Sequence, residues 1–166
     1  MRFTDCFDDL CRQLRGGGAF LVVQGPDGRP NPMTIGWATL GVVWSEPVMT
    51  VLVRPSRFTF GLLEQAKRFS VCAPLGGRLE SELAFCGSRS GRDCDKVKEC
   101  GFKVGPGVAR GVSVLEDCDL FYECEIVHRT KVVPETLAVD IAGSCYPQGD
   151  FHTMCSGRIV HSYRRG

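Results

Sequence analysis

The sequence lacks an excess of charge of either sign. Its 20 Lys and Arg residues nearly balance its 19 Asp and Glu residues, which leaves a formal net charge of +1 over 166 residues. Proteins that bind along a nucleic-acid backbone need a large cationic excess, because affinity there comes from neutralising phosphates. We therefore expect no nucleic-acid partner, although the balance is compatible with one small, locally basic pocket.

Long hydrophobic runs are also missing. The longest apolar stretches, near residues 38–44 and 48–53, are far shorter than the roughly 20 residues that a membrane-spanning helix needs. The first five residues carry an arginine and an aspartate and no apolar segment of the kind found in secretory signals. We expect a cytoplasmic protein with no membrane partner.

Several common catalytic and cofactor motifs are absent. No G-x-G-x-x-G follows a predicted strand, no Gly-Lys-Ser/Thr occurs, and no G-x-S-x-G occurs. The signatures of a Rossmann dinucleotide site, a P-loop and a hydrolase nucleophile elbow are therefore missing. A nucleotide-like cofactor would have to bind by other means.

The ten cysteines include no C-x-x-C pair, and the three histidines form no paired ligand motif. Zinc and iron–sulfur sites usually show tight local spacing of their ligands, so we predict no metal site. Without a signal peptide, disulfides are disfavoured, and free thiols then behave as small buried hydrophobes. We predict reduced, structural thiols, with Cys72 and Cys124 inside strands. The alternative of a redox-active thiol points to Cys86.

Apolar, β-branched runs predict strands, and helical spacing predicts a few short helices between them. Twenty Gly and nine Pro favour short elements and turns over a helix bundle. The fold class that we expect is mainly β with inserted helices, a small antiparallel barrel that forms a single domain over residues 1–166. The predicted strands are 19–24, 33–43, 48–53, 69–72, 120–133 and 154–163, and the predicted helices are 57–68, 79–87 and 93–100, the last capped by Asp93 and Gly101.

A first basic turn, residues 54–59, lies where a predicted strand ends and a predicted helix begins. Helix N-termini present unpaired N–H groups and a partial positive charge. Ser56 is a natural N-cap and Thr59 follows on the first turn, while Arg54 and Arg57 could clamp an anion. The segment predicts a phosphate site, and the alternative is a plain capped helix with solvated arginines.

A second basic turn, residues 86–93, has a similar character: Cys86-Gly87-Ser88-Arg89-Ser90-Gly91-Arg92-Asp93. Gly87 and Gly91 allow the backbone to approach a ligand closely, and Lys96 lies one turn further on, at i+4 from Arg92. The alternative is a surface loop with solvated charges. Two such turns in one small domain favour an anionic ligand held between them.

A third segment, Asn31-Pro32-Met33-Thr34-Ile35-Gly36-Trp37, contains the chain's one asparagine. An amide, a hydroxyl and a glycine beside an aromatic ring could recognise and cover a planar heteroaromatic ring. The alternative is an ordinary strand start with Trp37 in the core.

Taken together, these segments resemble the flavin reductase-like, FMN-binding split-barrel family, which includes flavoredoxin. The likeness runs from about residue 18 to 162, the expected core of a flavin reductase-like domain. The matching stretches, in order, are 31–37, 53–57, 85–87, 90–96, 119–124 and 146–152.

The resemblance implies a split β-barrel that forms a homodimer and binds FMN non-covalently near the dimer interface. It implies that the first turn holds the phosphate, that the third segment lies along the flavin ring and ribityl chain, and that the second turn also reaches the cofactor. The implied cofactor-binding residues are Asn31, Met33, Thr34, Trp37, Arg54, Ser56, Arg57, Thr59, Cys86, Gly87, Ser90, Gly91, Arg92 and Lys96.

The segment 149–152 resembles the Gly-Asp-His motif of two-component flavin reductases, with one residue inserted before the histidine. This implies a catalytic place for His152 beside the nicotinamide side of the flavin, and the alternative is a strand-end histidine without a catalytic role. Lys96 or Arg92 is the candidate for stabilising negative charge on the ring.

Three functions follow from the resemblance. The chain could be an NAD(P)H-dependent flavin reductase, with NADH or NADPH as electron donor. It could be a flavoredoxin-type electron transfer protein that serves a redox partner protein. The third alternative is a non-redox binding module for FMN or another phosphate ester.

Overall fold

The computed structural model describes residues 1–165, which form nine strands, five α-helices and one 3₁₀ turn. The helices are α1 (Phe7–Gly16), α2 (Phe58–Gln65), α3 (Glu80–Ser88), α4 (Lys96–Cys100) and α5 (Val139–Cys145), with the 3₁₀ turn at Pro134–Thr136. The strands are β1 (Ala19–Gln24), β2 (Pro30–Ile35), β3 (Ala38–Val43), β4 (Glu46–Val53), β5 (Arg68–Ala73), β6 (Val104–Pro106), β7 (Ser113–Leu115), β8 (Leu120–Lys131) and β9 (Thr153–Arg164).

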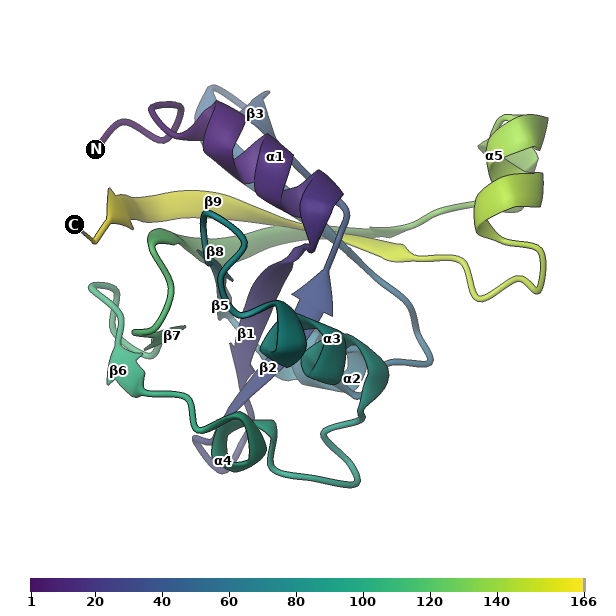
Figure 1. Cartoon of the computed structure of the whole chain (residues 1–166). Coiled ribbons are helices and arrows are strands. Elements are labelled where there is room, and N and C mark those ends of the chain that lie inside the picture. Colours follow the sequence, from purple (N-terminus) through teal and green to yellow (C-terminus); the bar gives the residue numbers. More distant parts are fainter. Residues whose placement is uncertain (166) are drawn as a thin grey trace.

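Seven strands form one antiparallel sheet in the order β2-β1-β5-β8-β9-β4-β3, and β6 and β7 form a separate pair. The two edge strands, β2 and β3, are consecutive in the chain. The sheet curls until β2 contacts β4, next to the opposite edge, without pairing to it (Figure 1). This open, curled sheet is the split barrel that we expected, so the predicted fold class is confirmed.

The central strands are buried on both faces, which explains why β1 reads as a continuous apolar run rather than an alternating one. Leu21 and Val23 of β1 join a core cluster inside the curl, to which α1 contributes Leu10. Phe20 and Val22 point to the other face and join a second cluster with residues of α3 and β7. Helices therefore cover the outer face of the sheet at β1.

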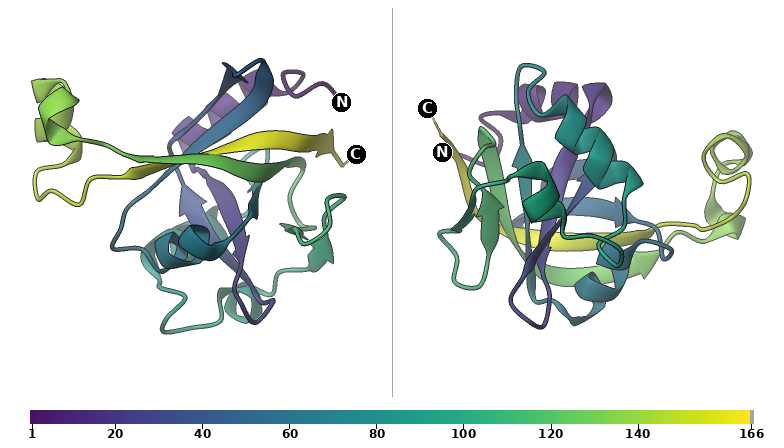
Figure 2. Two further views of the ribbon diagram at one scale, coloured as in Figure 1. Left: turned by 180° about the vertical axis from the view of Figure 1, so that it is seen from behind. Right: turned by 60° about the horizontal axis from the view of Figure 1, so that its bottom comes forward.

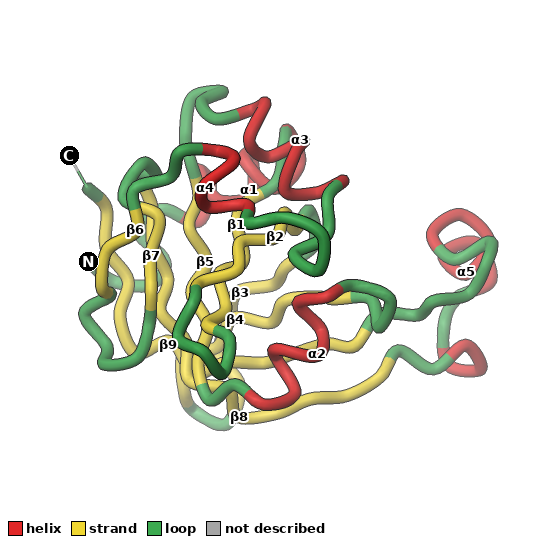
Figure 3. The backbone as a smooth tube through the Cα atoms, turned by 90° about the horizontal axis from the view of Figure 1, so that it is seen from below, coloured by secondary structure: helices red, strands yellow, loops and turns green. Residues whose placement is uncertain are grey.

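The distal ends of β8 and β9 leave the barrel and carry α5 as a projecting arm, residues 132–151 (Figures 1 and 2). The view from below shows the same arm standing away from the other helices (Figure 3). Val139 and Ile141 on α5 are 88% and 44% exposed. The arm therefore presents apolar side chains that no other part of residues 1–165 covers.

The element boundaries correct several expectations. Residues 33–43 are two strands, because the chain bends at Gly36 and Trp37, and α1 and α5 were not predicted. The cap of α4 is Asp95, whose carboxylate accepts from two backbone N–H groups, rather than Asp93. The N-cap of α2 is Arg57 rather than the predicted Ser56, which lies one residue before it.

Cys72 and Cys124 are buried in β5 and β8, as predicted, and none of the ten cysteines is bonded to another. Among residues 1–165, no cluster of three or more His, Cys, Asp or Glu side chains could hold a metal ion. Within the same range, no helix has the length and apolar character to cross a membrane.

Close packing between β9, β8 and β5 depends on Gly157. A Cβ atom there would lie 2.6 Å from Cys124 Cβ and 2.8 Å from the Phe69 ring. We expect Gly157→Ala to lower the free energy of unfolding by about 1–3 kcal/mol, because overpacking a tight core forces displacement. The strand glycine Gly41, where a Cβ would meet nothing within 4 Å, is the matched control. Denaturant unfolding that gives equal losses for both variants would contradict this account.

Candidate functional site

The two basic turns lie against each other. Arg57 of the first turn donates from Nη1 to the carbonyl of Gly87 at 3.1 Å. Arg92 of the second turn donates from Nη1 to the carbonyl of Ser56 at 3.3 Å. These reciprocal bonds join the start of α2 to the end of α3 and the loop that follows it, and their partners lie 30 and 36 residues apart in the chain.

The space between the turns, which we call the arginine hollow, has a volume of about 120 Å³. Its lining includes the cationic side chains of Arg57, Arg89, Arg92 and Lys96 and no acidic residue. Hydroxyl groups of both turns surround these cations: Ser56, Thr59, Ser88 and Ser90. Cations and hydroxyls without a carboxylate form a site for an anion such as a phosphate.

Lys96 is the cation at the floor of this hollow. Only 4% of the residue is exposed, and its Nζ donates to the carbonyls of Cys86 at 2.9 Å and Pro32 at 3.1 Å. Burial lowers the pKa of the Lys96 ammonium, because the charged form is poorly solvated there. An ammonium has three donors, and the hydrogen bonds within residues 1–165 use two of them. The third N–H is available to a ligand.

A second space, the tryptophan hollow, adjoins the first and has a volume of about 180 Å³. Met33 and Arg57 line both hollows. Trp37 is 42% exposed at its wall and packs against His152, with ring centroids 4.8 Å apart. Trp37 is therefore not the core residue of the alternative interpretation, and it gives the hollow an aromatic wall. The rest of the lining is Thr34, Ile35, Gly36, Leu52, Val53 and Arg54.

His152 lies immediately before β9, with 9% of its surface exposed. Its Nδ1 is 2.9 Å from the Tyr146 hydroxyl. Burial, reinforced by the nearby Arg54 charge, lowers the pKa of His152 to about 4. The imidazole is therefore neutral near pH 7. In this form it shares a hydrogen bond with the Tyr146 hydroxyl but is not an imidazolium that could donate its extra proton.

Arg54 is directed toward the loop that carries His152. Its guanidinium donates to the carbonyls of Cys145 at 2.9 Å and Asp150 at 3.0 Å and lies over the Tyr146 ring. The Ser56 hydroxyl donates to the Asp150 carboxylate at 2.6 Å. Both predicted phosphate ligands thus anchor the arm loop in this structure. The backbone of Asp150 is left-handed, with φ of 54°.

Asn31 and Thr59 bind each other rather than facing the tryptophan hollow. Asn31 Nδ2 donates to Thr59 Oγ1 at 2.8 Å, and both residues are buried. Gly91 packs against this pair, because a Cβ there would lie 2.2 Å from Asn31 Oδ1 and 2.7 Å from the Phe58 ring. Three positions along an extended strand span about 10 Å, so β2 cannot bring both Asn31 and Thr34 to one small hollow.

Cys86 lines the arginine hollow but is 1% exposed. Burial raises the pKa of its thiol to about 12, with a smaller contribution from the neighbouring Cys100. A thiol that stays protonated at neutral pH is a poor nucleophile. The structure therefore favours the structural interpretation of Cys86, whose backbone carbonyl holds Lys96.

Sequence reasoning missed three residues that shape the site. Arg89 belongs to the second turn, and its charge is the signal that could have identified it. Tyr146 bonds to His152, six residues away, and Asp150 bonds to Ser56, 94 residues away. Local sequence patterns do not predict such pairs.

A family model described as "Flavin reductase like domain" matches residues 13–166. No curated protein sequence matches.

Solved structures share the fold. An FMN-binding protein from Thermus thermophilus with bound p-hydroxybenzaldehyde is 29% identical, with a TM-score of 0.70 over 90% of this chain and 72% of that one. Flavoredoxin from Methanosarcina acetivorans is 24% identical, with a TM-score of 0.69 over 89% and 67%. The NADH:FAD oxidoreductase SgcE6 from Streptomyces globisporus C-1027 is 19% identical, with a TM-score of 0.68 over 90% and 75%.

The depressed pKa of His152 predicts a pH-dependent stability. Because the folded-state pKa of about 4 lies below the ordinary value of 6.5, the unfolded chain takes up this proton first. The contribution of neutral His152 to the free energy of unfolding is complete above pH 6.5 and is lost as the pH falls toward 4. We expect His152→Gln to flatten the decline in unfolding free energy between pH 7 and 5, measured by denaturant titration. An unchanged decline would show that His152 is not buried in neutral form.

Proposed function

Because the chain belongs to the flavin reductase-like family, we propose that it is an FMN-binding oxidoreductase. The observation that carries this proposal is the arginine hollow, where four cationic side chains and no carboxylate surround one small space. A phosphate monoester supplies the negative charge that such a space lacks. The adjoining tryptophan hollow offers an aromatic wall for a flat ring.

The residues divide by chemistry into those that would hold the phosphate and those that would contact the ring. Arg57, Arg89 and Arg92 have the charge for the phosphate, with the hydroxyl of Ser90 beside them. Met33, Thr34 and Trp37 line the ring side, and Gly87 lies against Thr34. Arg54, Asn31, Thr59, Gly91 and the Cys86 carbonyl position these groups through the bonds and packing described above.

A bound flavin would supply the chemistry that side chains lack, namely acceptance and release of an electron pair. The chain's own residues would orient the ring and set its electrostatics. Lys96 lines the ligand space, where its buried positive charge would favour added negative charge. Neutral His152, held by Tyr146, would set the shape and hydrogen bonding of the nicotinamide side without donating a proton from its charged form.

The electron donor that we propose is NADH or NADPH, bound directly against the flavin. The exposure of Trp37 supports this, because a second planar molecule can reach the wall of the tryptophan hollow from solvent. A flavoredoxin-type carrier that exchanges electrons with a partner protein is the second candidate. It is favoured by the same exposure, since an accessible ring serves electron transfer between proteins equally well.

One experiment separates these functions. The purified protein is mixed with excess FMN, desalted, and examined by visible absorption. Retained flavin bands near unit stoichiometry support the proposal. Bleaching of the bands by NADH or NADPH without oxygen identifies a reductase, and bands that only a chemical reductant bleaches identify a carrier. A colourless protein with no measurable FMN affinity would contradict the proposal.

Loss of one charge-assisted contact to the phosphate should weaken binding roughly ten- to a hundredfold. We expect this loss for Arg57→Ala in fluorescence titrations with FMN, because Arg57 lines both hollows. Arg15→Ala, an arginine in the last turn of α1, is the control that should keep the full affinity. Equal FMN affinities of the two variants would show that Arg57 does not hold the phosphate.

We also propose that the chain forms a homodimer through the projecting arm. Val133, Val139 and Ile141 expose apolar surface that a second copy would cover. Light scattering should give twice the 18.2 kDa mass of the chain. Val139→Asp with Ile141→Asp should shift the protein toward monomer, whereas Val108→Asp, at an exposed residue off the arm, should not. A monomeric wild-type protein would refute the assembly.

A further inference from the structure

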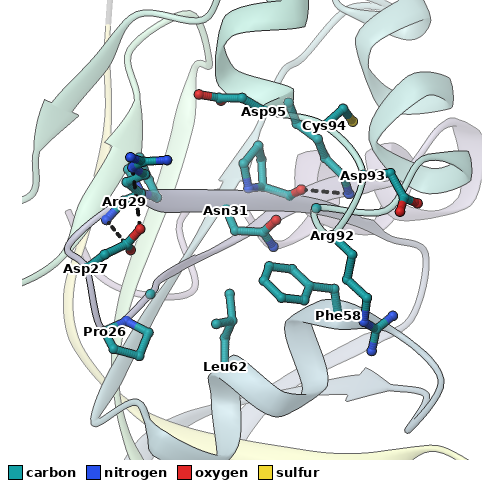
Figure 4. A pocket seen from close by; sticks show the side chains of 15 residues that line it. Pro26, Asp27, Arg29, Asn31, Phe58, Leu62, Arg92, Asp93, Cys94 and Asp95 are labelled. Carbon is teal, nitrogen blue, oxygen red and sulfur yellow. Dashed lines mark hydrogen bonds and ion pairs between the residues drawn. The ribbon is translucent and has the colours of Figure 1, made fainter.

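The donors around the arginine hollow carry a positive charge. Arg92, for example, extends from the second basic turn past the Phe58 ring (Figure 4), with its guanidinium 5.6 Å from the ring centroid. The tryptophan hollow is lined in addition by a neutral group, the imidazole of His152. One nitrogen of a neutral imidazole carries a hydrogen and the other accepts one, so the tautomer decides which of the two a ligand in this hollow meets.

The Tyr146 hydroxyl occupies one of the two imidazole nitrogens. Its oxygen lies 2.9 Å from His152 Nδ1, and both residues are buried. His152 lines the tryptophan hollow, whereas Tyr146 does not. Within residues 1–165, Nε2 has no hydrogen-bond partner, and Nδ1 has only the tyrosine. Nε2 is therefore the nitrogen that is left for a ligand in the hollow.

The surroundings of Tyr146 favour its hydroxyl as the donor in this hydrogen bond. Burial raises the pKa of the hydroxyl, which therefore keeps its hydrogen at neutral pH. The Arg54 charge and a hydrogen bond from the backbone N–H of His152 oppose that rise. Both also polarise the O–H bond and strengthen it as a donor. With Tyr146 as the donor, Nδ1 accepts and the imidazole hydrogen belongs on Nε2.

The position of the hydroxyl is fixed by the packing of the Tyr146 ring. Phe151 stacks on this ring, with centroids 4.7 Å apart and an interplanar angle of 22°, and the Arg54 guanidinium lies 5.1 Å from its centroid. The carbonyl of Tyr146 accepts from the Gly149 N–H at 3.0 Å, which closes a turn before His152. Arg54 donates to carbonyls on both sides of this turn. The turn therefore directs the hydroxyl back toward the imidazole.

No carboxylate within residues 1–165 binds the imidazole. Burial is the main cause of the low pKa of His152, the charges of Arg54 and Arg57 lower it further, and Asp150 opposes them. The Asp150 carboxylate is bound instead to the backbone N–H and the hydroxyl of Ser56. A carboxylate on the imidazole would favour the imidazolium, so this arrangement preserves the neutral form.

We infer that Tyr146 is a positioning residue for His152: its hydroxyl donates to Nδ1 and fixes the imidazole hydrogen on Nε2, which then donates to a carbonyl or amide oxygen of a ligand in the tryptophan hollow. Flavin and nicotinamide rings both carry such an oxygen, so the identity of the ligand rests on the proposed function. The contact is a hydrogen bond and transfers no proton. The tautomer is a property of the protein without ligand, which makes it separately testable.

Long-range ¹H–¹⁵N correlation NMR of the ¹⁵N-labelled protein identifies the tautomer, because a ring nitrogen that carries hydrogen and one that accepts it resonate far apart. The His152→Gln variant assigns the His152 signals. The wild-type protein should show the Nε2–H form alone. Tyr146→Phe keeps the ring and removes the hydroxyl. It should give a mixture of both tautomers and raise the pKa of His152 toward 6.5, because the neutral form loses a donor.

Tyr163→Phe is the matched control. It removes a hydroxyl that donates to Glu123 at 2.8 Å, near the other end of β9. The tautomer and the pKa of His152 should stay unchanged in this variant. If Tyr146→Phe does not fold, the wild-type spectrum still decides, because an Nδ1–H form there overturns the inference.

Titration of the wild-type protein with FMN tests the ligand contact. FMN should move the Nε2 signal more than the Nδ1 signal and slow the exchange of the Nε2 hydrogen with water. FMN that binds without changing either signal overturns the contact with the ligand.

The outcomes separate this inference from the proposed function. An Nδ1–H tautomer in the wild-type protein, or a single Nε2–H tautomer in Tyr146→Phe, overturns the role of Tyr146 and leaves the FMN proposal standing. An Nε2–H tautomer that depends on Tyr146 in a protein that binds no FMN supports the role of Tyr146 and overturns the flavin proposal.

Discussion

The site depends on the two reciprocal hydrogen bonds between the basic turns, which we call the clasp. Arg57 reaches across to the carbonyl of Gly87, and Arg92 reaches back to the carbonyl of Ser56. Each guanidinium carries five N–H donors, so one bond to a carbonyl leaves others for a ligand. The clasp therefore fixes the positions of both cations and keeps them available, which a pair of freely solvated arginines would not achieve.

Concentrating positive charge in this way has an energetic cost. Lys96 is held in a desolvated position by two carbonyls, and its lowered pKa reflects that burial. Arg57 lies close enough to lower the same pKa further. An anion in the arginine hollow would relieve this repulsion, so a phosphate ligand should stabilise the fold as well as bind to it. The barrel supplies the rigidity, since β2 and α3 each provide one carbonyl to Lys96.

The sequence predicted features that local patterns determine. β1 was placed correctly because six consecutive residues favour a strand. The two basic turns were recognised from charge, glycine and hydroxyl content. The split-barrel expectation came from the resemblance rather than from strand order, which local patterns give poorly.

Features that depend on distant pairs were not predictable in this way. Thr59 looked like a phosphate ligand at a helix start, yet it is buried against Asn31, 28 residues away. Arg54 looked like part of an anion clamp, yet three carbonyls of the arm loop accept from it. In both cases a hydrogen bond to a distant part of the chain uses a side chain that the local pattern had assigned to the phosphate.

A crystal structure of the protein with FMN tests the central claim most directly. The account predicts that the phosphate lies between the two basic turns, in contact with Arg57 and with at least one of Arg89, Arg92 and Lys96, and that the flavin ring lies beside Trp37. A phosphate bound to one turn alone, or a flavin ring seated away from Trp37, would contradict it.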